Sequence, residues 1–137
     1  MIKRRKQPNR WSEILGWLKL AEDDLKLAQL AYEDGFSRGA VSRTYYAMFY
    51  AAKAFLLVNL AQVDFKTHAG LIAQFHKLAK AKKLPAQLPK QLTAAFEARG
   101  EADYDLNETI GQREAGEHLA AASHFVETIQ HYLHSRR

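Results

Sequence analysis

One segment of this chain, residues 37–59, is apolar or aromatic on nearly every side when it is wound as a helix. A helix at a protein surface keeps one polar face toward water, so a helix without such a face has to be covered on several sides. No part of the chain shows the apolar–polar alternation that is typical of β-strands. The segment therefore predicts an all-α fold, in which it lies at the centre of a bundle or faces two partners.

Apolar residues at spacings of three and four predict further helices around this segment. We expect Ser37 to cap the start of the central helix and Thr67 to cap the helix that follows. Pro85 and Pro89 mark the start of the next helix, where a missing backbone N–H does least harm. The fold class that follows is an antiparallel four- to five-helix up-down bundle. The further helices are expected at residues 11–33, at 68–82, from Pro85–Pro89 to about Gly100, and at 112–134.

The net charge of +5 is concentrated at the N-terminus. The first ten residues contain five basic residues and no acidic one, whereas residues 11–137 hold equal numbers of both. We therefore expect two parts, a basic flexible tail over residues 1–10 and a single helical bundle over residues 11–137. Such a tail is either a solvated end or an electrostatic contact for nucleic acid or an acidic partner.

The composition excludes several classes of function. The chain has no cysteine, so neither disulfide nor thiolate chemistry contributes. No apolar run reaches the roughly 18 residues that span a bilayer, so we expect a cytoplasmic protein without membrane contact. There is no glycine-rich phosphate loop or serine nucleophile elbow, and the six histidines lack the spacing of metal ligands. We expect neither a metal nor a cofactor.

Arg99 interrupts the apolar face of the fourth helix, at a position where an apolar side chain is due. A guanidinium there has to be paired or has to face a wet cleft, because burying an unpaired charge is very costly. Asp103, four residues on, can pair with it, and Tyr104 follows. We therefore take Arg99, Asp103 and Tyr104 as candidate catalytic residues, and Arg99 also as a candidate RNA- or nucleotide-binding residue.

Three further residues are candidates for binding RNA or a nucleotide. Tyr46 belongs to a run of aromatic residues that either stack on bases or pack in a core or at a subunit interface. Arg43 lies one turn before it and can face a cleft. His68 follows a helix cap, where the positive helix end favours a neutral imidazole. That state suits a general base, and a surface hydrogen bond is the alternative role.

Three motifs occur in an order that is typical of a known family: SRTYYAMFYAAKAFL in the second helix, KTHAGLIAQF at the start of the third and RGEADYD after the fourth. With these motifs the chain resembles the HEPN domain, and more closely the small stand-alone HEPN proteins associated with minimal nucleotidyltransferases. The resemblance covers nearly all of the chain beyond the basic tail. It implies a helical bundle that forms a homodimer and acts in a toxin–antitoxin pair, with a minimal nucleotidyltransferase as its partner.

The resemblance also implies roles for particular residues. Many HEPN toxins cleave RNA without a metal in a dimer cleft, using an arginine followed after four to six residues by a histidine. Arg99 matches the arginine, but Tyr104, Asp105 and Leu106 stand where the histidine is due. In other members a tyrosine ends the signature and accepts AMP from the partner transferase, and Tyr104 resembles that tyrosine.

Three interpretations of the function follow. In the first, the chain is a dimeric, toxin-like partner of a minimal nucleotidyltransferase and binds RNA or nucleotide in a cleft around Arg99. In the second, it is an active metal-independent ribonuclease toxin in which Asp103, Tyr104 or His68 replaces the missing histidine. In the third, it is a structural or interaction bundle without a nucleotide site, where Arg99 and Asp103 form only an ion pair and Tyr104 packs against the fifth helix.

Overall fold

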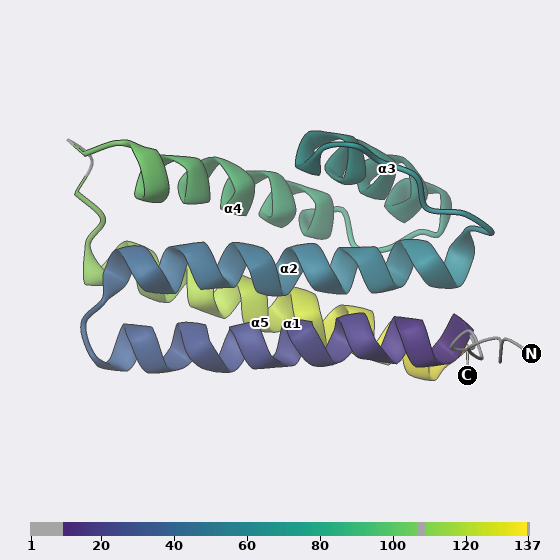
Figure 1. Cartoon of the computed structure of the whole chain (residues 1–137), viewed down its shortest axis with the longest axis horizontal. Helices are drawn as coiled ribbons and strands as arrows, with labels where there is room; N and C mark the ends of the chain where they lie inside the picture. Colours follow the sequence, from purple (N-terminus) through teal and green to yellow (C-terminus); the bar gives the residue numbers. More distant parts are fainter. Residues whose placement is uncertain (1–9, 107–108, 137) are drawn as a thin grey trace, which may run out of the picture.

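The computed structural model describes residues 10–106 and 109–136. In these two ranges the chain forms five α-helices and no strand, as the sequence predicts (Figure 1). Among the described residues, no helix combines the length and the apolar character that a bilayer-spanning segment needs. The helices are α1 (Arg10–Glu33), α2 (Ser37–Asn59), α3 (His68–Ala81), α4 (Gln87–Tyr104) and α5 (Gln112–His134).

α2 is the central helix of the bundle. It packs against α1, α3, α4 and α5, and in Figure 1 it runs between α1 and α4. Thirteen of its 23 residues are buried, Tyr45 and Phe55 among them. The apolar surface of α2 is therefore covered within a single chain, which accounts for its missing polar face without a second copy.

A row of aromatic side chains joins three helices through the core. Between ring centroids, Phe75 of α3 lies 5.4 Å from Phe55 of α2 and 5.4 Å from Phe125 of α5. Phe55 lies 4.8 Å from Tyr132 of α5. The three phenylalanines have no exposed surface, and Phe75 is the largest side chain that α3 buries. Phe75 is thus the main apolar anchor of α3.

α4 ends later than the sequence predicts. The expected end was near Gly100, but the helix continues to Tyr104. Ala102, in this last turn, is buried, and the Arg38 side chain of α2 donates a hydrogen bond to its carbonyl oxygen. This contact between distant parts of the chain stabilises a turn whose own helical signal is weak. The segment that begins at Arg99 is therefore helical and lies against α2.

Of the two predicted helix caps, one is confirmed and one is wrong. The Thr67 hydroxyl accepts a hydrogen bond from the Gly70 amide at 2.9 Å, as expected for the start of α3. The N-cap of α2 is Phe36, which makes no side-chain cap bond. Ser37 lies inside the helix instead, where its hydroxyl donates to the side-chain oxygen of Gln112 at 2.7 Å. The Ser37 hydroxyl, which the prediction assigned to the helix cap, is thus bonded to a residue of α5 instead.

Arg10 is the first residue of α1, although the sequence places it in the basic tail; residues 1–9 lie outside the described residues. Its guanidinium donates from Nε to the Leu57 carbonyl at 2.9 Å and from Nη1 to the Ala61 carbonyl at 3.0 Å. The Leu57 carbonyl belongs to the last turn of α2, where a cation is favourable, and Ala61 lies just beyond the C-cap of that helix. Arg10 therefore ties the start of α1 to the end of α2.

The end of α3 forces a lysine into a left-handed conformation. Lys83 has φ of 58°, and it is the one non-glycine residue with positive φ in the part of the chain described. The Leu84 amide donates to the Ala79 carbonyl at 2.9 Å and the Lys83 amide to the Lys80 carbonyl at 3.2 Å. These two bonds are those of the helix-ending motif that usually has glycine at this position.

Lys83→Gly is expected to stabilise the protein by about 0.5 to 1 kcal/mol, because glycine adopts positive φ without the steric cost of a Cβ. Urea unfolding measures the difference in the free energy of unfolding. An unchanged or lower free energy would contradict the left-handed conformation of this residue. Lys82→Gly, just before it at negative φ, is the matched control and is expected to destabilise.

Candidate functional site

The Arg99 side chain lies among aromatic rings. Its guanidinium carbon is 5.2 Å from the ring centroid of Tyr45, 5.8 Å from that of Tyr46 and 5.9 Å from those of Phe96 and Tyr104. Only 14% of the side chain is exposed. The faces of aromatic rings carry negative charge density that stabilises a guanidinium, so this cation is tolerated at a largely buried position.

The hydrogen bonds of Arg99 leave much of its charge without a partner. Its Nη1 lies 3.5 Å from Oδ2 of Asp103, which is a long contact. The other oxygen of Asp103 accepts a bond from the Ser42 hydroxyl at 2.5 Å. The Nε of Arg99 is buried and has no hydrogen-bond partner among the described residues. The charge is therefore only weakly compensated, and the exposed part of the guanidinium, rather than the buried Nε, can still bind an anion with planar or tetrahedral oxygens.

His68 joins this group through Tyr45. The Tyr45 hydroxyl and Nδ1 of His68 are 2.7 Å apart, and the imidazole stacks on Phe49 with 4.3 Å between ring centroids. Burial and the nearby Arg99 charge lower the pKa of His68 below its ordinary value. Burial raises the pKa of Tyr45, so its hydroxyl stays protonated. The neutral imidazole expected from the sequence thus has a different main cause, which is burial rather than the helix end.

Arg99→Gln is expected to raise the pKa of His68 toward its ordinary value of about 6.5, because one of the two causes of its depression is removed. A pH titration of the His68 ring protons by NMR measures the shift. A pKa that stays the same or falls would show that Arg99 does not act on His68.

The same substitution changes how stability depends on pH. A histidine with a lower pKa in the fold than in the unfolded chain takes up its proton on unfolding, so the wild type loses stability as the pH falls through about 6.5 toward the folded pKa. Arg99→Gln should narrow the pH range between the unfolded and folded pKa of His68, so the free energy of unfolding should fall less at low pH than in the wild type. Urea unfolding at about pH 7.5, 6.5 and 5.5 measures this difference.

The structure does not bring Arg43 to this group, although the sequence suggests a shared cleft. Nη1 of Arg43 lies 3.2 Å from Oδ1 of Asp24, a buried carboxylate on α1. Arg43 thus compensates a buried charge on the side of α2 that faces α1. Tyr46, one turn further on, does contact Arg99. We call Tyr45, Tyr46, His68, Arg99 and Asp103 the Arg99 cluster.

A comparison with known protein families matches residues 14–132 to the HEPN domain. The chain belongs to the HEPN domain family. The match covers all of the described helices apart from their outermost residues, so the resemblance seen in the sequence motifs is confirmed. The all-α bundle agrees with this family as well.

Curated relatives of this HEPN chain come from archaea and bacteria. A protein of Methanocaldococcus jannaschii named "Putative toxin MJ0142" is 35% identical over 126 residues, which is 90% of this chain and 84% of the relative. A second protein of that organism, "Putative toxin MJ0605", is 31% identical over 122 residues, or 88% and 89% of the two chains. A UPF0332 protein of Gloeobacter violaceus is 35% identical over 116 residues, or 82% and 90%.

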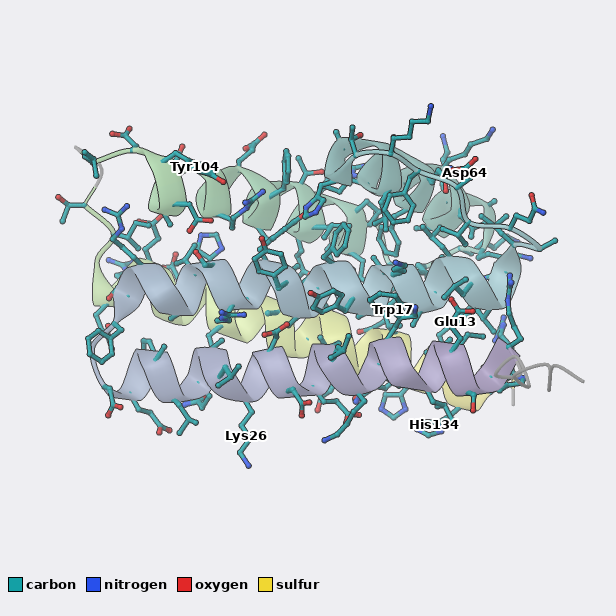
Figure 2. The ribbon with its side chains drawn as sticks, in the orientation of Figure 1. Glu13, Trp17, Lys26, Asp64, Tyr104 and His134 are labelled. Carbon is teal, nitrogen blue, oxygen red and sulfur yellow. The ribbon has the colours of Figure 1, made fainter. Side chains whose placement is uncertain are left out.

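Tyr104 of the HEPN chain ends α4 next to the cluster and faces solvent (Figure 2). The residue is 77% exposed. The structural interpretation of the sequence requires Tyr104 to pack against α5, and this exposure speaks against such packing. The Arg99–Asp103 pair of that interpretation is present, but its length and the unpartnered Nε make it weak compensation. Tyr104 therefore offers an accessible phenol beside a cation.

The sequence placed Tyr45 only within a run of aromatic residues, whereas the structure places it at the centre of the Arg99 cluster of this HEPN chain. On a helix that is apolar all round, it reads as one more core aromatic. A signal was present nevertheless, since a buried tyrosine hydroxyl needs a hydrogen-bond partner. Its partner is His68, and its ring also supports Arg99.

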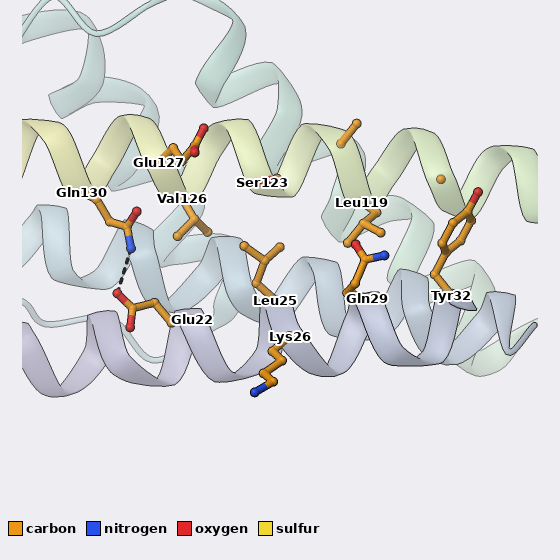
Figure 3. Close-up of a pocket in the computed structure, with 12 residues that line it drawn as sticks. Glu22, Leu25, Lys26, Gln29, Tyr32, Leu119, Ser123, Val126, Glu127 and Gln130 are labelled. Atoms are coloured by element: carbon orange, nitrogen blue, oxygen red, sulfur yellow. Dashed lines mark hydrogen bonds between the residues drawn. The ribbon is translucent and has the colours of Figure 1, made fainter. Parts of the chain in front are cut away.

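A groove between α1 and α5 of this HEPN bundle lies apart from the Arg99 cluster (Figure 3). Leu25, Leu119 and Val126 line it, and at its rim Gln130 donates to Glu22 at 2.8 Å. Lys26, its one basic side chain, points away from α5 (Figure 3). Such a lining has little to offer an anion. The described residues also contain no group of three or more His, Asp or Glu side chains placed to hold a metal ion.

Proposed function

We propose that this chain is the toxin-like component of a toxin–antitoxin pair, which binds RNA or nucleotide phosphate at the Arg99 cluster and has a minimal nucleotidyltransferase as its partner. The observation that carries the proposal is the state of Arg99, a mostly buried guanidinium with one long carboxylate contact and a buried, unpartnered Nε. The toxin names of two relatives support the general assignment.

Phosphate is the anion that suits this arrangement best. A guanidinium binds phosphate oxygens through two parallel N–H bonds, and the rings of Tyr46 and Tyr104 beside it can stack on bases. A neutral His68 adds no second positive charge but offers a ring nitrogen for a hydrogen bond. RNA or a nucleotide carries both the phosphate and the bases that this combination would recognise.

The partnership is proposed to act through Tyr104. Its phenol oxygen would attack the α-phosphorus of ATP, the bond to pyrophosphate would break, and the phenol proton would be lost, which leaves AMP on the tyrosine. The support for this step is the exposure of Tyr104 at the end of α4. Mass spectrometry after co-expression with the transferase tests it, and unmodified Tyr104 would count against it.

We also propose that the chain acts as a homodimer, which would bring two Arg99 clusters together. The support is membership of the HEPN family. The apolar surface of α2 gives no support for a dimer, because it is already covered within one chain. Sedimentation at micromolar concentration separates a dimer from a monomer of 15.6 kDa. A monomer would remove the paired cleft from the proposal.

Expression in a host cell tests the function as a whole. The proposal expects growth arrest when the chain is produced alone, relief when the transferase is co-produced, and binding of RNA by the purified protein. A chain that is harmless and binds neither RNA nor nucleotides would refute the proposal.

Ribonuclease activity is a second candidate, and the position of His68 favours it. The structure places this imidazole on the same tyrosine ring that supports Arg99. As a general base it could take the proton of a 2′-hydroxyl that attacks the adjacent phosphorus. The bond to the 5′-oxygen would break, that oxygen would take up a proton from water, and a cyclic phosphate would remain. Cleavage of RNA that is lost in His68→Gln, with RNA binding retained, would select this candidate over binding alone.

A further inference from the structure

The stretch over residues 65–96 contains six lysines and no acidic residue. It comprises α3, the connection to α4 and the first half of α4. All six lysines are exposed, and none forms an ion pair with a described residue. Elsewhere, some exposed basic side chains pair with acids one turn on, as in Lys19–Asp23 and Arg113–Glu117, whereas Lys26 does not. The lysines are Lys66, Lys77, Lys80, Lys82, Lys83 and Lys90.

Five of these lysines lie on the second half of α3, on the connection to α4 and on the first turn of α4, and we call them the lysine surface: Lys77, Lys80, Lys82, Lys83 and Lys90. Lys77 lines a separate pocket beside Leu60. Two of them, Lys80 and Lys90, line a groove between the two helices. Further along the same helix pair, Nε2 of His76 and the Thr93 hydroxyl are 2.8 Å apart. A positive surface without acids along a groove attracts a polyanion.

The lysine surface exposes no large hydrophobic side chain, and the apolar part of its groove consists of Ala79, Leu84, Ala86 and Pro89. The large hydrophobic side chains that are exposed among the described residues all lie outside residues 65–96. Protein interfaces are depleted in lysine and enriched in aromatic residues at their centre, whereas phosphate contacts need mainly positive charge. The exposed apolar side chains are Leu20, Leu27, Leu30, Phe36, Tyr104 and Leu106.

Lys83 adds an independent observation. It is a charged residue in a left-handed position where glycine is more stable, and local strain of this kind is often kept where a side chain has a function. The side chain of Lys83 is exposed and makes no ion pair, so no contact within the described chain explains why a lysine stands there.

α3 connects the lysine surface to the Arg99 cluster. Its first residue is His68 in the cluster, and its last turn carries Lys80, about 18 Å away at 1.5 Å per residue. Several nucleotides of an extended strand span such a length. The rings beside Arg99 can stack only on unpaired bases, because an RNA duplex hides its base faces.

We propose that the lysine surface binds the sugar–phosphate backbone of a single-stranded RNA, another part of which occupies the Arg99 cluster. This inference rests on the proposed function and extends it to a second contact region. The lysines supply sequence-independent affinity and hold the strand along α3. The Arg99 cluster then receives one phosphate and its neighbouring bases.

The test compares two variants with the same change in net charge. One replaces Lys77, Lys80, Lys82 and Lys83 by glutamine. The control replaces four basic residues elsewhere. Both variants are checked for folding by circular dichroism. Binding of labelled single-stranded RNA of about 20 nucleotides, U-only and A-only, is measured by fluorescence anisotropy between about 50 and 200 mM salt. The control residues are Lys19, Lys26, Arg113 and Arg136.

The lysine variant is expected to lose about 100-fold in affinity near 0.1 M salt, and its salt slope should fall by about 2 to 3, since each single-strand phosphate contact contributes about 0.7. The loss should be the same for both RNAs, because backbone contacts do not read sequence. The control variant should keep nearly all of the affinity and the slope.

Other outcomes would overturn the inference and can be told apart. If the lysine variant binds like the control while Arg99→Gln loses binding, the lysine surface is not the contact and the proposed function stands. If the wild type binds neither RNA, the proposed function fails and the inference with it. If the lysine variant keeps RNA binding but no longer copurifies with the transferase, the surface serves an acidic protein instead.

Lys83→Gly tests the same inference with a single substitution. The inference expects opposite effects, a thermal midpoint raised by a few degrees and a salt slope lowered by about 0.7. A merely structural residue would not show this combination. A raised midpoint with an unchanged slope would remove Lys83 from the RNA contact.

Discussion

Arg99→Gln is expected to abolish the growth arrest that we propose for this chain and to lower its affinity for RNA by about 10- to 100-fold, since a hydrogen bond to a charged group contributes about 1.5 to 3 kcal/mol. Glutamine keeps much of the length and some hydrogen bonding but removes the charge. Among the described residues, Arg99 is the only arginine or lysine that contacts the rings of Tyr45 and Tyr46, so no other permanent cation can replace it.

Two further variants separate charge from geometry. Arg99→Lys keeps the charge but loses the planar fork and the ring stacking, and should restore only part of the binding. Asp103→Asn removes the weak carboxylate partner and should leave RNA affinity equal or higher, because the guanidinium loses a competing anion. Full toxicity of a folded Arg99→Gln protein would place the functional site elsewhere.

Phe75→Ala is expected to cost about 3 to 5 kcal/mol of the free energy of unfolding, the largest effect on stability that we predict. The side chain has no exposed surface and contacts Phe55 and Phe125, so alanine leaves a cavity between three helices. Urea unfolding measures the loss. Because Phe75 anchors α3, RNA binding should weaken as well.

Two control substitutions test whether the loss of stability comes from the buried volume of Phe75. Phe75→Leu keeps most of the volume and should cost much less than alanine. Phe36→Ala removes the same atoms at a site that is 67% exposed and should stay within about 0.5 kcal/mol. A similar loss for Phe36→Ala would show that the difference does not come from burial.

The fold was predictable because helix periodicity is local. The repeat of apolar residues located all of the described helices, and Thr67 was found as a cap since a hydroxyl before a helix acts on its own first turn. The end of α4 was not predictable, because it depends on Arg38, which lies far away in the sequence. Ser37 failed as a cap for the same reason, since its partner is on α5.

The site was predictable only in part. Arg99 stood out as a charge on an apolar face, and His68 as a histidine at a helix start. Both side chains contact the ring of Tyr45. This arrangement depends on how α2, α3 and α4 pack, which no spacing in the sequence reveals. The lysine surface was missed for another reason. The charges cancel when they are summed over residues 11–137, although the run of lysines without an acid over residues 65–96 is visible in the sequence. That Lys80 and Lys90 line one groove depends on how α3 and α4 pack.

The closeness of Tyr104 to Arg99 has a consequence for how a toxin of this kind could be silenced. A nucleotide attached to the Tyr104 oxygen would carry its phosphate within reach of the guanidinium, whose carbon is 5.9 Å from the tyrosine ring. A tethered anion acts at an effective concentration in the millimolar range or above, far beyond that of a free competitor. The modified protein would thus carry its own inhibitor, bound in the place of RNA, and it would stay inactive after the transferase has left.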